Sequence, residues 1–82
     1  MKLPRNLSAR DLEKALFRAY GYSFTRQTGS HRRLTSTSLG EHHLTVPDHT
    51  PLRAGTLRAI LGKVMEHRRI SLATILQELN LG

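Results

Sequence analysis

Three short segments with the character of β-strands follow one another in the first half of the chain, and the loops between them are only a few residues long. They cover residues 22–27, 31–36 and 42–46. Parallel strands need a crossover of about a dozen residues or more, so loops this short permit only an antiparallel meander. In the first segment large side chains alternate with smaller polar ones, which predicts a strand with one buried face.

Helical periodicity flanks this meander on both sides. Residues 8–20 place apolar side chains at helical spacing and begin with Ser8, a residue type favoured at the N-cap. Apolar residues recur in the same way over residues 57–64 and over residues 72–79, and Ser71 is the expected N-cap of the last helix. The apolar face of the sheet needs a cover, so we expect an α+β domain of order α-β-β-β-α-α with its helices on one side.

The chain is strongly and unevenly basic. Its 82 residues contain 13 Lys and Arg against 6 Asp and Glu, a formal net charge of +7. From Lys14 to Gly40 there are five cationic residues and no carboxylate. We therefore expect a positive surface and a polyanionic partner. The length of the chain predicts one domain spanning residues 1–82.

Several functional classes are disfavoured by what the sequence lacks. There is no cysteine, which excludes disulfides and thiolate zinc sites and agrees with a reducing compartment. His42 and His43 are neighbours on a strand and point to opposite faces, and His49 has no carboxylate at a familiar ligand spacing. We therefore expect no metal and no cofactor. The short polar start, residues 1–6, predicts neither a secretory signal nor a membrane segment, and hence a cytoplasmic protein.

One histidine lies inside the basic segment. His31 follows the turn residues 28–30 directly and is flanked by Arg26, Arg32 and Arg33. Histidine has an ordinary pKa of about 6.5, so it can take and give a proton at neutral pH. On local chemistry alone, a histidine at this place is more often an ordinary surface residue. The wider pattern favours a catalytic one.

Four features occur in an order that resembles one family. Phe24 lies in the first strand, and Arg-Gln-Thr-Gly-Ser-His follows over residues 26–31. Val-Pro-Asp-His then covers residues 46–49, and Gly-Thr-Leu-Arg-Ala-Ile-Leu covers residues 55–61. Together they resemble the HicA toxin family over about residues 8–61.

The resemblance implies a fold like that of the double-stranded-RNA-binding domain, here α-β-β-β-α with an extra C-terminal helix. It also implies a type II toxin that acts as an mRNA interferase, a catalytic histidine at His31, and neutralisation by a HicB antitoxin. The chain departs from the family in a longer connection over residues 64–69 and in a last helix that ends near Leu81. These departures leave the dimer surface and the details of antitoxin docking open.

Around His31, guanidinium groups match phosphate oxygens, and a turn hydroxyl adds a further donor. Strand alternation puts Arg33 on the face of His31 and Arg32 on the other. His49 is either an accessory acid/base group or a loop residue that holds the third strand to the second helix. The candidate RNA-binding residues are Arg26, Ser30, Arg32 and Arg33.

The leading hypothesis is a metal-independent endoribonuclease in which His31 is the acid/base group, with RNA as substrate. We expect a monomer alone and a hetero-oligomer with the antitoxin. One alternative is an RNA-binding module of the same fold without catalysis. Another is a DNA-binding regulator that uses the last two helices as a helix-turn-helix, although residues 72–79 contain no Arg or Lys to reach a groove.

Overall fold

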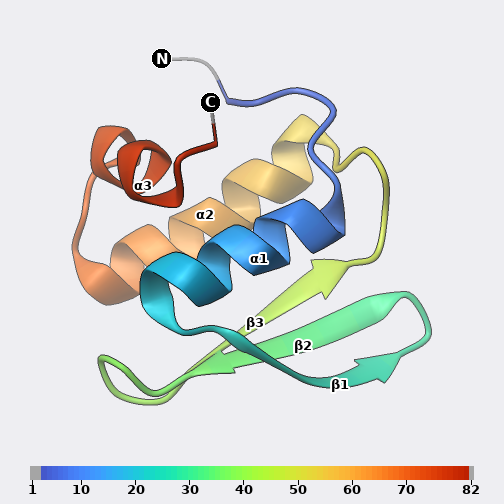
Figure 1. Ribbon diagram of the computed structural model, residues 1–82, viewed down its shortest axis with the longest axis horizontal. Helices are drawn as coiled ribbons and strands as arrows, with labels where there is room; N and C mark the ends of the chain where they lie inside the picture. Colours follow the sequence, from blue (N-terminus) through green and yellow to red (C-terminus); the bar gives the residue numbers. More distant parts are fainter. Residues whose placement is uncertain (1–2, 82) are drawn as a thin grey trace.

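The computed structural model describes residues 3–81 and has the predicted order of elements. The sheet is antiparallel in the order β1-β2-β3, and all three helices lie on one side of it (Figure 1). Within residues 3–81 no helix lies over the other face of the sheet (Figure 1). The elements are α1 (Ala9–Tyr20), β1 (Ser23–Thr28), β2 (His31–Ser36), β3 (His42–Pro47), α2 (Ala54–Arg68) and α3 (Leu72–Leu79).

Local signals set the ends of two helices. The Ser8 hydroxyl accepts a hydrogen bond from the Asp11 N–H at 3.0 Å and so caps α1, as predicted. Gly21 ends the same helix with φ 75°, a left-handed conformation that glycine adopts without a Cβ penalty. Ser71 caps α3 in the same manner by accepting from the Thr74 N–H at 3.1 Å.

The C-terminal part differs from the expectation in two details. Residues 64–68 belong to α2, which ends at Arg68 with Arg69 in the left-handed conformation, so the predicted long connection shrinks to residues 69–71. The last helix ends at Leu79 and not near Leu81, because Asn80 turns left-handed and its N–H bonds back to carbonyls of the last turn.

The predicted alternation in the first strand is wrong in its second half. Phe24 pairs with Leu34, but the register shifts at a bulge and Arg26 pairs with Arg33. An extra residue in one strand reverses its alternation from there on. All six residues of β1 are exposed, so the predicted buried face of this strand is wrong as well, although Tyr22 just before the strand is buried. Arg26 therefore joins the face of Arg33, opposite to the face of Phe24.

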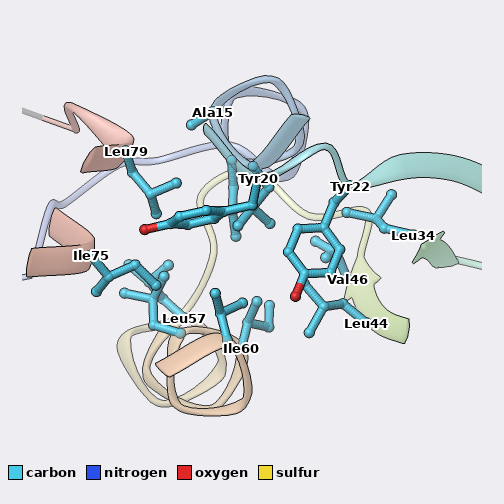
Figure 2. Packing of buried hydrophobic residues seen from close by; sticks show 14 of the residues in the cluster. Ala15, Tyr20, Tyr22, Leu34, Leu44, Val46, Leu57, Ile60, Ile75 and Leu79 are labelled. Carbon is cyan, nitrogen blue, oxygen red and sulfur yellow. The ribbon is translucent and has the colours of Figure 1, made fainter. Parts of the chain in front are cut away.

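One hydrophobic core fills the space between the sheet and the helices. Tyr20 and Tyr22 lie at its centre, and α3 contributes Ile75 and Leu79 to it (Figure 2). The apolar face of the last helix thus packs in the core. This helix is therefore a poor recognition helix for a helix-turn-helix. Other members from the sheet and α2 are Leu34, Leu44, Val46, Leu57, Ile60, Leu61 and Val64.

The uncovered side of the sheet is called the outer face below. Buried Leu34 and Leu44 point to the helices, so their strand neighbours point outward. The outer face carries Thr25, Arg26, Thr28, His31, Arg33, Thr35, His43 and Thr45. In residues 3–81 no helix is long and apolar enough to cross a membrane.

Candidate functional site

The first hairpin turn presents His31. Thr28 and His31 are paired, so only Gly29 and Ser30 make the turn. Gly29 has φ 59° and Ser30 is not left-handed, the combination that a type II′ hairpin turn requires. His31 is the first residue of β2 and is exposed on the outer face.

Two hydrogen bonds fix this turn. The Gln27 side-chain amide donates to the Gly29 carbonyl at 2.9 Å, and the Asp48 N–H donates to the Ser30 carbonyl at 2.6 Å. Ser30 itself is exposed at the tip of the hairpin. The turn is therefore attached both to β1 and to the segment after β3, and this holds the backbone of His31 in place.

His31 lies in a shallow pocket on the outer face. The pocket has a volume of about 190 Å³ and is lined by residues of all three strands. Two of the predicted residues, Arg26 and Arg33, come together there with His31. Thr28 and Thr45 complete the lining and were missed from the sequence, because only the register places Thr45 opposite Arg33.

Arg26 and Arg33 are directly opposite each other on neighbouring strands. Like charges in this position destabilise a sheet. In the described part of the chain neither guanidinium has an ion pair with a carboxylate. The pocket beside His31 therefore concentrates positive charge that an anion would neutralise.

Arg32 is separated from the other predicted contacts. It points toward the helices, is buried, and donates two hydrogen bonds to the Glu13 carboxylate at 2.5 and 3.1 Å. It donates a third to Gln27 at 2.9 Å and lies over the Phe24 ring at 4.1 Å. The hydrogen bond to Glu13 raises the pKa of Arg32. Its guanidinium thus joins β2 to α1, and phosphate binding by Arg32 stays a prediction that this placement does not favour.

His49 lies in the loop after β3 and does not line the pocket. Its side chain is exposed, and its carbonyl accepts a hydrogen bond from the Ala9 N–H at 3.0 Å. This hydrogen bond attaches the loop to the start of α1. An accessory acid/base role for His49 stays a prediction.

His42 and His43 point to opposite faces of the sheet. His42 stacks on His67 on the helix side, whereas His43 bonds to Thr35 on the outer face. Within residues 3–81 no three His, Cys, Asp or Glu side chains are grouped so that they could hold a metal ion.

Comparison with protein families gives a match. The model of the HicA toxin of bacterial toxin–antitoxin systems matches residues 9–65, well over half of the chain. This range contains α1, the whole sheet and most of α2. No curated protein and no solved structure matches the chain. The chain therefore belongs to the HicA family, the toxins of bacterial toxin–antitoxin systems.

Proposed function

We propose that this toxin is a metal-independent endoribonuclease that cleaves mRNA in the pocket around His31. The observation that supports it most is the placement of an exposed histidine beside two opposed arginines, Arg26 and Arg33. Such a site offers a proton-transferring group and positive charge for one phosphodiester. Membership of the HicA family gives the same indication independently.

The chemistry needs a base, charge stabilisation and an acid. His31 removes the proton from a ribose 2′-hydroxyl, and the resulting oxyanion attacks the adjacent phosphorus. The bond from phosphorus to the 5′-oxygen of the next nucleotide then breaks, and that oxygen takes a proton from water or from a second group. The products are a 2′,3′-cyclic phosphate and a free 5′-hydroxyl.

Arg26 and Arg33 stabilise the negative charge that builds up on the phosphoryl oxygens. Guanidinium groups donate hydrogen bonds in a fork that fits two such oxygens. Both side chains line the pocket with His31, so they need no large movement to reach the same phosphate. Ser30, exposed at the turn, donates one further hydrogen bond to the RNA.

A toxin of this kind requires a restraint, and we propose a HicB-type antitoxin as the partner. The net charge of +7 favours an acidic or substrate-mimicking segment that covers the pocket. Co-purification tests this, because a complex that leaves His31 fully accessible contradicts direct blocking.

The decisive experiment compares the wild-type protein with His31→Ala and His49→Ala on one RNA. We expect His31→Ala to lose cleavage by about 100-fold or more, the contribution of a general base. The products of the wild-type reaction should carry a cyclic phosphate. Equal cleavage by wild type and His31→Ala would exclude this histidine from the mechanism, and a loss in His49→Ala alone would move the role to the loop.

Expression in a bacterial host separates the alternatives. Growth arrest that requires His31 fits a nuclease. A non-catalytic RNA-binding module or a DNA-binding regulator would have the same effect on growth with or without the His31→Ala substitution. The variant protein must be folded, and its thermal unfolding provides this control.

A further inference from the structure

A chain of hydrogen-bonded side chains crosses the outer face at the end away from His31. The Thr25 and Thr35 hydroxyls are 2.9 Å apart, and the Thr35 hydroxyl is 2.8 Å from Nδ1 of His43. Nε2 of the same ring is 3.0 Å from the Glu41 carboxylate. The residues come from all three strands and the loop before β3. The His43 ring is thus fixed from both sides.

Both ring nitrogens of His43 are engaged, and this limits what the ring can do. Nδ1 is in hydrogen-bond contact with the Thr35 hydroxyl, and Nε2–H donates to the Glu41 carboxylate. A ring held in this way has no free nitrogen for proton transfer. Its face remains available, because the side chain is 38% exposed. His31, in contrast, has no side-chain hydrogen bond within the described residues.

The spacing assigns His43 to a different nucleotide from His31. Thr35, the cross-strand partner of His43, is four residues from His31 on β2. Four residues of a strand extend about 13 Å. A single phosphodiester linkage cannot reach both places, so an RNA bound at His31 meets His43 only with a neighbouring nucleotide.

The charge around His43 favours binding of a nucleobase over binding of a phosphate. Glu41 lies against the ring, and a carboxylate repels phosphate oxygens. No such group lies in the pocket of Arg26 and Arg33. A flat ring that hydrogen bonds hold beside a carboxylate suits the face of a nucleobase, which stacks on aromatic side chains of sheet surfaces.

We propose that His43 is a base-stacking platform that binds one nucleotide flanking the cleavage site, and that Thr35 and Glu41 are positioning residues that hold its ring. The inference rests on the proposed function, since it assumes that RNA lies along the outer face. It adds a nucleobase site that is separate from the acid/base chemistry of His31.

The test measures RNA binding in the His31→Ala background, where RNA is bound but not cleaved. The probe is a single-stranded oligoadenylate in which one adenine at a time is replaced by 2-aminopurine, whose fluorescence falls on stacking. The background protein is compared with the same protein carrying His43→Ala or His43→Phe. Thermal unfolding of each variant shows whether it is folded.

We expect His43→Ala to weaken binding by about 5- to 150-fold, the range of base–aromatic stacking, and to abolish the quenching at one probe position. His43→Phe should restore part of the affinity, because it keeps a flat ring but loses the hydrogen bonds to Thr35 and Glu41 that hold the His43 ring. A loss of binding from a purely structural role would not be rescued in this way.

Three results would overturn the proposal. One is equal affinity of the proteins with and without His43→Ala, and another is a His43→Phe protein as weak as His43→Ala. Both leave the role of His31 intact if the wild-type protein cleaves RNA and His31→Ala does not. Complete failure of the His31→Ala protein to bind RNA would overturn both this platform and the proposed function.

Discussion

The imidazole rings of His42 and His67 stack with centroids 4.1 Å apart and planes 5° from parallel. The Tyr22 hydroxyl is 2.7 Å from Nδ1 of His42, and the ring packs between the start of β3 and the end of α2. Burial lowers the pKa of His42, and a charge on His67 lowers it further. His43, Arg68 and Lys63 act in the same direction. The His42 ring is therefore neutral in the folded protein at neutral pH.

This stack predicts a loss of stability in acid. The unfolded chain protonates His42 near its ordinary pKa of about 6.5, whereas the folded protein does so only at lower pH. As pH falls below about 6.5 the unfolded state binds more protons, so the free energy of unfolding decreases. Above about pH 7.5 His42 is neutral in both states, so its contribution to the free energy of unfolding no longer changes. Urea unfolding between about pH 7 and about pH 5 measures the effect.

His42→Gln is the matched control, because an amide keeps a partner for the Tyr22 hydroxyl but does not titrate. Its unfolding free energy should depend less on pH over the same interval. A wild-type protein whose stability is flat there, or a variant with the same slope, would contradict a neutral His42 in the fold.

The ion pair of Arg32 and Glu13 predicts that a substitution of Arg32 lowers the stability of the fold strongly. From the sequence alone, Arg32 is a candidate RNA-binding residue. Both side chains are nearly buried, at 11% and 12% exposure. Removing one partner leaves the other charge with little solvent, so Arg32→Met should lower the free energy of unfolding by about 2–4 kcal/mol. Glu13→Gln combined with Arg32→Met should cost less than the sum of the two single changes.

The same variants separate a structural from a phosphate-binding Arg32. With a structural role, the folded Arg32→Met protein keeps the salt dependence of RNA binding of the wild type. A smaller salt dependence in that protein would restore Arg32 to the RNA interface. Chemical denaturation and binding titrations at several salt concentrations give the two readouts.

The order of elements could be predicted from the sequence because it depends on local signals. Helical spacing, the caps at Ser8 and Ser71, and loops too short for crossovers are all properties of neighbouring residues. His31 at a hairpin turn follows from the same signals, since Gly29 marks the turn.

The details of the site depend on register, which neighbouring residues do not set. The bulge after Phe24 moves Arg26 to the outer face, and nothing in the residues 22–27 marks it. The bond from Arg32 to Glu13 joins β2 to α1 through tertiary packing. The contact of Thr35 with His43 likewise exists only in one pairing of β2 with β3.

Arg33→Ala predicts a specific change in the salt dependence of RNA binding. A guanidinium that neutralises one phosphate of single-stranded RNA contributes about 0.7 to the slope of log K against log salt. Arg33 lines the pocket with His31, so the slope should become shallower by about that amount. Arg58→Ala removes the same charge from an exposed position on α2 and should leave the slope nearly unchanged. Equal slopes for all three proteins would exclude a phosphate contact at Arg33.

Gly29→Ala tests whether the turn before His31 serves the fold or the RNA. With φ 59° an L-residue is strained at this position, while a Cβ there would meet no atom within 4 Å. The cost is therefore in the backbone alone, about 1–2 kcal/mol of unfolding free energy. Gly29→Asn should cost less, because asparagine tolerates the left-handed region better.

Cleavage should behave differently from stability in these two variants. Gln27 and Asp48, which lie outside the turn, donate hydrogen bonds to its carbonyls. The folded Gly29→Ala protein should therefore keep His31 in the same position and cleave RNA at nearly the wild-type rate. Denaturation gives the folded fraction, and the cleavage rate is divided by it. If Gly29→Ala kept its stability and lost cleavage, the space above Gly29 would have to be occupied by RNA, because only a bound ligand can then meet the added methyl group.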